Sequence, residues 1–150
     1  MITLPDYLMG RDVGRADELT EAVEANAREL LGRINLLLSW ALAAGVRAQG
    51  VASGWRPRGI NDATANAAKN STHLSGEGID LRDTAHRDLA RWCLLNLDAL
   101  EEIGLWMEDP QWTPSWVHLQ SRRPGSGRRV YVPSTRPALI ARLQEQDAAA

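Results

Sequence analysis

The amino-acid sequence predicts an α+β fold in which helices pack on a small antiparallel sheet, within a single domain that spans all 150 residues. Two observations carry this prediction. Apolar residues recur at three- and four-residue steps over residues 15–48 and again over residues 84–103, which is typical of helices with one buried face. Elsewhere, short apolar and alternating runs are separated by glycine and proline, which is typical of short strands.

The helices follow from the apolar spacing and from its start and stop signals. An N-terminal helical region is expected over about residues 15–48, either as one long helix or as two helices divided at a Thr20 cap, with Gly45 as its terminator. The next helix is expected to be capped by Thr84 and to run to about Ile103. A weak short helix over 61–69 and a last helix over about 137–146 complete the helical set.

The strands are expected between these helices, in a core that covers about residues 50–133. The candidate strands are 50–54, 78–82, 105–107, 116–120 and 130–132. Ile79 and Leu81 point to one face of their strand and leave Asp80 on the other, and His118 lies in the same way between two apolar neighbours. The turn over 124–127 predicts a hairpin that brings 130–132 against the preceding strand.

Composition and charge exclude several classes of function. The chain has 17 Lys+Arg against 19 Asp+Glu, whereas a protein whose main partner is nucleic acid needs a marked basic excess. Its one cysteine, Cys93, excludes an internal disulfide. The apolar run around residues 36–46 is too short to span a bilayer, and charges interrupt the first fifteen residues. We therefore expect synthesis in the cytoplasm without a signal peptide, and no membrane insertion.

The residues with the clearest chemical signal are two histidines and an aspartate. Gly76 and Gly78 permit a tight reversal of the chain that would bring His73 beside Asp80, and His118 projects from its own strand in the same way. Each histidine alone is more often structural than a ligand, but two imidazoles and one carboxylate together are the ligand set of many catalytic zinc sites. The same set suits a non-haem Fe(II) oxygenase, although two long helices match the usual β-rich fold of those enzymes poorly.

Three ordered motifs between residues 51 and 120 resemble the signatures of a known family. They are SGWRP at 53–57, SxHxxGxGxD at 71–80 and WVH at 116–118. Together they resemble the M15 peptidases, which are zinc D-alanyl-D-alanine carboxypeptidases, dipeptidases and phage endolysins with the Hedgehog/DD-peptidase fold. The opening at residues 6–12 and the compact length are most similar to the phage-encoded members. Gly78 stands where the family usually has alanine, which we take as a minor difference.

The resemblance assigns a role to each residue of these motifs. It implies that the two histidines and the aspartate bind Zn²⁺. It also implies that Arg56 holds a substrate carboxylate or polarises the scissile carbonyl, and that Ser71 hydrogen-bonds beside the site. Trp116 belongs to a group of tryptophans clustered around the motifs, and we expect it to line a cleft and bind substrate, with core packing as the alternative. A bound zinc ion would lower the pKa of water towards roughly 7.

The sequence differs from the family at the positions that usually hold the general base. Many members carry a Glu or His two or three residues before the last ligand, and this chain has Trp116 and Ser115 there. We therefore expect Glu108 to be the general base, with Asp109 as the substitute. The opposite interpretation, a solvated loop before Pro110, stays open at this point.

The expected function is that of a zinc-dependent peptidase that cleaves peptidoglycan stem peptides or cross-links. It would be a phage-encoded endolysin or a virion-associated lysin, a monomer that acts at the bacterial cell wall or periplasm after holin-assisted release or as part of the virion. The alternative is a catalytically weak or inactive wall-binding or virion structural module that retains the metal fold. Which bond is cut, and whether as a carboxypeptidase or an endopeptidase, stays open.

Overall fold

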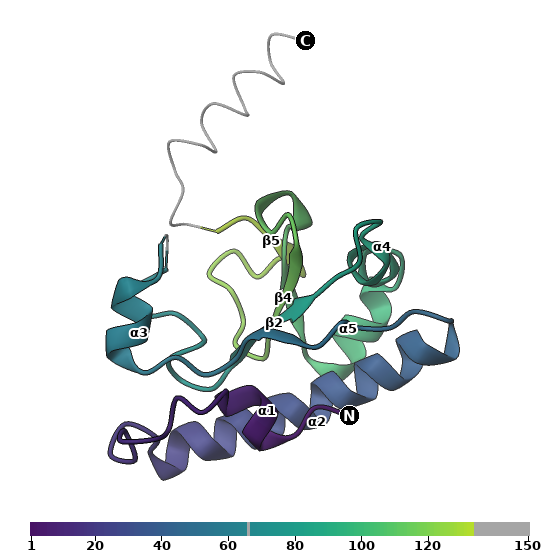
Figure 1. Ribbon diagram of the computed structural model, residues 1–150. Coiled ribbons are helices and arrows are strands. Elements are labelled where there is room, and N and C mark those ends of the chain that lie inside the picture. Colours follow the sequence, from purple (N-terminus) through teal and green to yellow (C-terminus); the bar gives the residue numbers. More distant parts are fainter. Residues whose placement is uncertain (66, 134–150) are drawn as a thin grey trace, which may run out of the picture.

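A computed structural model describes residues 1–65 and 67–133, which form a five-stranded sheet with helices around it, and the predicted α+β class is confirmed (Figure 1). The helices are α1 (Leu4–Leu8), α2 (Glu21–Ala43), α3 (Arg58–Ala63), α4 (Asp88–Leu95), α5 (Leu97–Ile103) and the 3₁₀ turn η1 (Pro110–Trp112). The strands are β1 (Val51–Ser53), β2 (Gly78–Arg82), β3 (Trp106–Glu108), β4 (Trp116–Gln120) and β5 (Val130–Tyr131). The expected helix over 137–146 lies outside the described residues.

The long helix α2 is shorter than expected at both ends and is not divided. Thr20 is its N-cap, and the threonine hydroxyl accepts a hydrogen bond from the backbone N–H of Val23 at 3.2 Å. The cap therefore begins the helix, because it satisfies a donor that has no partner within the first turn. Residues 10–18 before it are turns, and Gly45 with φ of +82° follows its end. No helix within the described residues is long and apolar enough to cross a membrane.

The helical segment after β2 is two helices rather than one, and two residues cap its start. The expected Thr84 accepts a hydrogen bond from the N–H of Asp88 at 3.2 Å, and Asp83 binds the next two N–H groups. The carboxylate of Asp83 accepts hydrogen bonds from the backbone N–H groups of Leu89 and Ala90 at 2.9 and 3.1 Å. A carboxylate before the first turn is stabilising there, so the helix begins at residue 88, four residues after Thr84. Asn96, with φ of −129°, separates α4 from α5. Helix α3 likewise lies earlier than the expected 61–69.

The strands are ordered β1-β2-β4-β3-β5 in one sheet. The pairs β1/β2, β2/β4 and β3/β4 are antiparallel, as predicted, but β3/β5 is parallel. The expected hairpin between β4 and β5 is therefore wrong. Both edges of β4 are already paired, with β2 and β3, so the chain after β4 crosses to the outer edge of β3. β5 runs opposite to β4, and it is therefore parallel to β3, because β3 and β4 are antiparallel.

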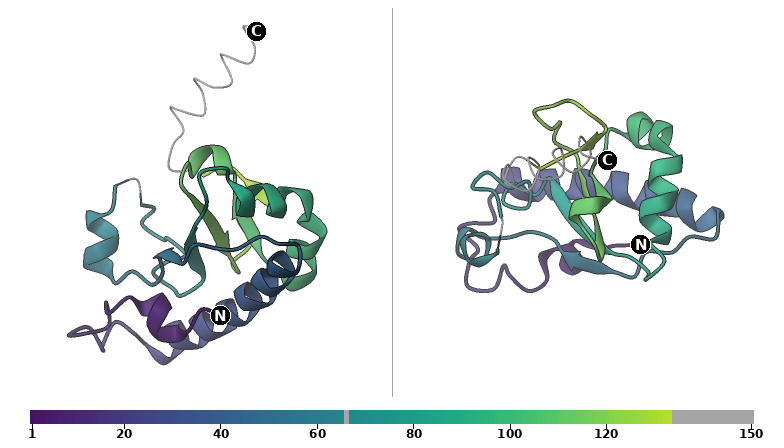
Figure 2. Two further views of the ribbon diagram at one scale, coloured as in Figure 1. Left: turned by 45° about the vertical axis from the view of Figure 1, so that its right-hand side comes forward. Right: turned by 90° about the horizontal axis from the view of Figure 1, so that it is seen from above.

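One face of the sheet belongs to the hydrophobic core. Its residues Ile79, Leu81, Met107, Val117 and Leu119 are at most 1% exposed. They pack with buried residues of α2, α4 and α5 in one cluster. Figures 1 and 2 show α4 and α5 on one side of the sheet, α3 on the other, and α2 running beneath. The alternate residues of β2, β3 and β4 point away from this core.

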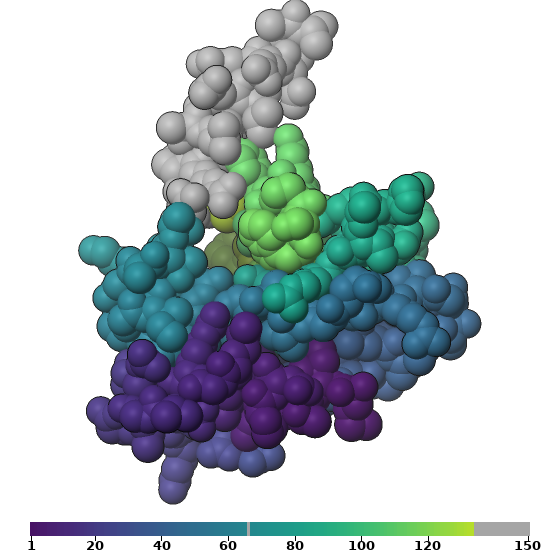
Figure 3. All heavy atoms as spheres, in the orientation of Figure 1, coloured from purple at the N-terminus to yellow at the C-terminus, as the bar shows by residue number. Residues whose placement is uncertain are grey.

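The N-terminal segment contains a short helix, α1, that the apolar pattern did not predict. A capping box between Thr3 and Asp6 holds its first turn. Tyr7 is fully buried and donates a hydrogen bond from its hydroxyl to the carbonyl oxygen of Gly78 at 2.9 Å, while the Tyr7 carbonyl accepts one from the N–H of Trp55. Figure 3 shows this segment in purple along the lower part of the molecule. Residues far apart in the chain thus meet at the start of β2.

Candidate metal centre

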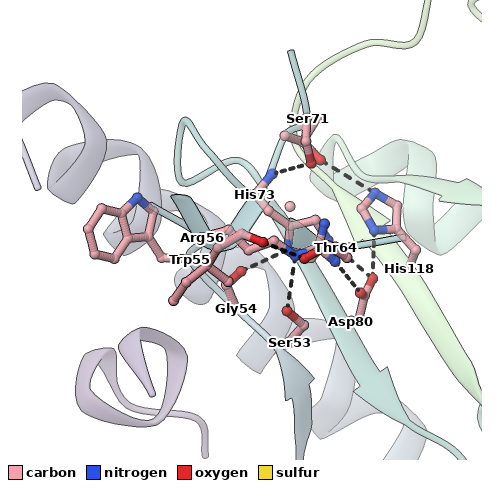
Figure 4. A network of polar contacts seen from close by, with 12 residues as sticks. Ser53, Gly54, Trp55, Arg56, Thr64, Ser71, His73, Asp80 and His118 are labelled. Carbon is pink, nitrogen blue, oxygen red and sulfur yellow. Dashed lines mark hydrogen bonds and ion pairs between the residues drawn. The ribbon is translucent and has the colours of Figure 1, made fainter. Parts of the chain in front are cut away.

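The candidate metal centre consists of His73, Asp80 and His118. The nitrogen and carboxylate oxygen atoms that these residues could offer to a metal ion lie within 4.8 Å of one another. The three residues are only 3%, 7% and 6% exposed. Figure 4 shows both rings directed at the carboxylate of Asp80, which the guanidinium of Arg56 also reaches. The expectation that the two histidines and the aspartate come together is therefore confirmed.

Strand register and one glycine turn bring these residues together. Asp80 and His118 are direct partners in the antiparallel β2/β4 ladder, so their side chains lie on the same face of the sheet. His73 comes from the loop before β2, which reverses at Gly76 with φ of +79°. A Cβ at Gly76 would lie 2.5 Å from the carbonyl oxygen of Val23, so the close approach of this loop to α2 also requires glycine.

The ring of His73 is oriented by a backbone carbonyl group. Its Nδ1 lies 2.7 Å from the carbonyl oxygen of Gly54, which only accepts hydrogen bonds, so Nδ1 carries the proton. The lone pair of Nε2 then faces Asp80, 3.3 Å from Oδ1. Burial lowers the pKa of His73, which favours the neutral, metal-binding form. A second nitrogen bound to a carbonyl is the usual environment of a metal-binding histidine.

The ring of His118 has a hydrogen-bond partner at each nitrogen. Nδ1 lies 2.8 Å from Oδ1 of Asp80, and Nε2 lies 2.9 Å from Oε1 of Gln120 and 3.5 Å from the hydroxyl of Thr72. Burial opposes protonation of this ring, but the hydrogen bond and charge of Asp80, together with Glu108 and Gln120, outweigh it and raise the pKa of His118. In the absence of a metal ion, the raised pKa and the 2.8 Å contact both favour a proton between Nδ1 and the carboxylate.

Asp80 is the common partner of both rings and of an arginine. Burial opposes its ionisation, but the charges and hydrogen bonds of His73 and His118 outweigh that effect and hold the pKa of Asp80 well below its usual range. Arg56 contacts the other carboxylate oxygen, Oδ2, at 3.3 Å. Asp80 is therefore ionised at neutral pH, which is the form in which a carboxylate binds a cation.

The donor atoms fit a metal ion. Two ligand atoms that each lie about 2.0–2.2 Å from a tetrahedral ion are roughly 3.3–3.6 Å apart. The distance between Nε2 of His73 and Oδ1 of Asp80 is 3.3 Å, while the 2.8 Å between Nδ1 of His118 and the same oxygen is a hydrogen-bond distance that must widen slightly. The buried cluster could therefore hold a metal ion once these distances, all within 4.8 Å, adjust to its geometry.

The sequence-predicted site residues surround a single cleft of about 980 Å³. Its lining includes Arg56, Ser71, His73, Asp80, Glu108, Trp116 and His118. Arg56 has its guanidinium on Asp80, and the hydroxyl of Ser71 accepts a hydrogen bond from the backbone N–H of His73 at 3.2 Å. Trp116 is partly exposed at the start of β4.

Glu108 lies on the same face of the sheet as the cluster. The β3/β4 pairs Trp106↔Gln120 and Met107↔Leu119 place Glu108 opposite His118 when the register continues by one residue. Strand pairing joins Ser53, Asp80 and His118 directly, and Glu108 with Tyr131 directly; the continued β3/β4 register aligns the two sets as one row across the sheet. The carboxylate of Asp109, by contrast, accepts a hydrogen bond from the N–H of Gln111 as the cap of η1. The two neighbouring acids therefore have different environments, and only Glu108 lines the cleft.

Sequence reasoning missed several residues that shape the site. Gly78 is not a minor difference, because a Cβ there would lie 2.1 Å from the hydroxyl oxygen of Thr72 and 3.1 Å from Cε1 of His118. Gln120 follows His118 by two residues, so strand alternation could have placed it on the same face. Tyr131 had no local signal, because its position depends on the parallel β3/β5 pairing.

Comparisons with known proteins give no match for this chain among protein-family models, curated proteins or solved structures. What the geometry establishes is a buried cluster that could hold a metal ion, on the face of a mixed sheet and inside a cleft. Any assignment of an activity therefore depends on that geometry and on the three motifs in the sequence.

Proposed function

We propose that the protein is a zinc-dependent peptidase of the M15 type that cleaves peptidoglycan stem peptides or cross-links. The observation that carries the proposal is the row of Asp80, His118 and Glu108 on adjacent strands, with His73 closing the cluster. The cluster supplies two imidazoles and a carboxylate as ligands, and Glu108 adds a second carboxylate beside them. All four side chains line one cleft, whose 980 Å³ is ample for a short peptide.

His73, Asp80 and His118 would hold the zinc ion. When bound, the ion would supply Lewis acidity, which lowers the pKa of water and polarises a peptide carbonyl group. The protein's own contribution is to keep the three donors close together and buried, while the proton on Nδ1 of His118 would have to leave when the ion binds. The pKa directions of Asp80 and His73 both favour the metal-binding forms, an ionised carboxylate and a neutral ring.

Glu108 would carry the proton. A peptidase must take a proton from the attacking water and deliver one to the leaving amine, because an amide nitrogen is a poor leaving group without it. Ser115 and Trp116, which occupy the positions that often hold this group in the family, lack a side chain that accepts a proton near neutral pH. Glu108 lies opposite His118 in the extended register and faces the cleft, which supports it over Asp109.

Arg56 would have two tasks. Its guanidinium contacts Asp80 and also has a hydrogen bond from Nε to the hydroxyl of Ser53 at 3.3 Å, which fixes it at the cleft wall. A guanidinium held in this way orients the aspartate and presents remaining N–H donors to a substrate carboxylate or carbonyl oxygen. Trp116 and Ser71 would shape the neighbouring substrate surface.

The M15 resemblance also supplies the biological setting of the proposal. The protein would be an endolysin or a virion-associated lysin that acts on the bacterial cell wall, and its domain would belong to the Hedgehog/DD-peptidase fold. The competing function is a wall-binding or virion structural module that keeps the metal centre without catalysis. Activity against the wall polymer separates the two.

The test is digestion of purified peptidoglycan by the zinc-loaded full-length protein, with mass analysis of the released fragments. The wild type is expected to contain about one zinc ion per chain by elemental analysis and to release peptide fragments or D-alanine. Glu108→Gln should keep its zinc and its fold but lose at least ~100-fold in rate, the low end for general acid–base catalysis. Zinc-free His73→Ala should be inactive.

Asp109→Asn is the matched control, because it neutralises the adjacent carboxylate and asparagine still caps η1. It should cleave at nearly the wild-type rate. A wild type that binds zinc but never cleaves would favour the binding module. Iron rather than zinc in the purified protein would favour oxygenase chemistry.

A further inference from the structure

The ring of His118 is held on the side away from Asp80 by the side-chain amide of Gln120. The distance from Nε2 of the ring to Oε1 of the amide is 2.9 Å, and Gln120 is 5% exposed. The same amide oxygen accepts a hydrogen bond from the hydroxyl of Tyr131 at 2.6 Å, and the amide nitrogen donates to the carbonyl oxygen of Arg122 at 2.7 Å. Every hydrogen-bonding atom of this short chain of groups has a partner.

The carbonyl group at the end of the chain decides the direction of each hydrogen bond. The carbonyl oxygen of Arg122 only accepts, so the NH₂ group of Gln120 must face it. The amide oxygen then faces His118 and only accepts, so Nε2 of the ring must carry a proton. In a neutral ring the lone pair is therefore on Nδ1, directed at Asp80 and the candidate metal position.

The reversed amide would have the opposite effect. An NH₂ group directed at Nε2 requires a lone pair there, which moves the proton of the neutral ring to Nδ1 and blocks the metal position. Tyr131 is satisfied in either orientation, because its hydroxyl can donate to the amide oxygen, as here at 2.6 Å, or accept from an NH₂ group, so the Arg122 carbonyl decides. Thr72 offers no replacement, since its hydroxyl lies 3.5 Å from Nε2 of His118, at the limit of a hydrogen bond.

We propose that Gln120 is a positioning residue that fixes the tautomer of His118, so that this ring binds the metal ion through Nδ1. The inference rests on the proposed metal site and assigns it an asymmetry, in which His73 binds through Nε2 and His118 through Nδ1. The carbonyl oxygen of Gly54 sets the first ring directly, and that of Arg122 sets the second through the amide. Both tautomers are thus determined by the main chain.

The first test measures zinc affinity of the full-length protein by competition with a chromophoric chelator. Gln120→Leu has nearly the same volume but removes the acceptor, and it should weaken zinc binding roughly 10–100-fold, the usual effect of losing such a partner. Tyr131→Phe should weaken binding less, because Arg122 still orients the amide. Tyr7→Phe is the matched control, since it removes the other tyrosine hydroxyl and its buried bond to Gly78. It should lower the melting temperature without changing zinc affinity.

The second test reads the tautomer itself, by ¹⁵N-detected NMR of the histidine rings in the zinc-loaded wild type. We expect a proton on Nε2 of His118 and on Nδ1 of His73. Equal zinc affinity of Gln120→Leu and wild type, or a proton on Nδ1 of His118, would overturn the inference. Failure of the wild type to bind zinc would instead refute the metal site, and with it the inference. Should Gln120→Leu not fold, the tautomer in the wild type decides.

Discussion

Gly78→Ala adds one methyl group at the start of β2, two residues before Asp80 of the candidate metal centre. The new Cβ would lie 2.1 Å from the hydroxyl oxygen and 2.8 Å from Cβ of Thr72, and 3.1 Å from Cε1 of His118. Ordinary contacts between such atoms are about 3.5–4.0 Å. Thr72 is therefore pushed by more than an ångström, or β2 shifts away from it.

The cost follows from the packing around the glycine. Thr72 and His118 are 8% and 6% exposed, so neither has free space to move into. One excess methyl group in a well-packed interior costs typically 1–3 kcal/mol. For a chain of about this size, that loss lowers the melting temperature by roughly 2–12 °C. Zinc affinity should fall as well, because the ring of His118 is displaced from its partners.

Thermal and urea unfolding of Gly78→Ala with and without zinc measures both effects. Gly32→Ala is the matched control of opposite sign. Gly32 lies in the interior of α2, and no atom beyond its own stretch of helix lies within 4 Å of the new methyl group. Alanine there should stabilise the protein by up to ~1 kcal/mol. Thr72→Ala removes the nearest atom, so the double variant should lose less stability than the sum of the two single losses. Unfolding of Gly78→Ala within about 0.5 kcal/mol of wild type would refute the reasoning, because overpacking should exceed that value.

Two further predictions concern parts of the molecule outside the cleft. Burial raises the pKa of the Cys93 thiol to about 12 and leaves it fully inaccessible, so a thiol reagent at pH 8 should label the protein only after unfolding in urea; labelling of the folded protein at the rate of a free thiol would contradict this. Thr20→Ala removes the N-cap of α2 and should lower the free energy of unfolding by about 1 kcal/mol, whereas Thr20→Ser should keep the cap hydrogen bond. Equal melting temperatures for the two variants would show that the cap contributes nothing.

Local patterns predicted those parts of the fold that local interactions determine. Alternation around Asp80 and His118 was sufficient to place both side chains on the polar face, because the apolar neighbours of each residue require the core. Thr20 was recognised as a cap, and the structure shows that it begins α2 rather than dividing it. The α+β class follows from the same patterns.

The errors arose where contacts that the local pattern does not show decide the structure. Thr84 does accept a hydrogen bond from the N–H of Asp88, but its neighbour Asp83 also binds the N–H groups of Leu89 and Ala90, and the helix begins only at residue 88. The turn before β5 has the signature of a hairpin, but both edges of β4 are already paired. Tyr131 thereby reaches Gln120 through a strand pairing that local sequence does not encode.

The row of Ser53, Asp80, His118, Glu108 and Tyr131 takes one residue from each strand of the sheet. Contacts of this kind join segments that are distant in sequence. Such contacts form slowly, because a long loop must lose entropy in closing before the contacts can stabilise it. The complete row therefore exists only once the last strand has docked. Tyr131 belongs to β5, a strand of two residues paired only with β3 among the described strands. Opening of this edge, the shortest strand of the sheet, would loosen the support of His118 while the apolar face of the sheet stays folded.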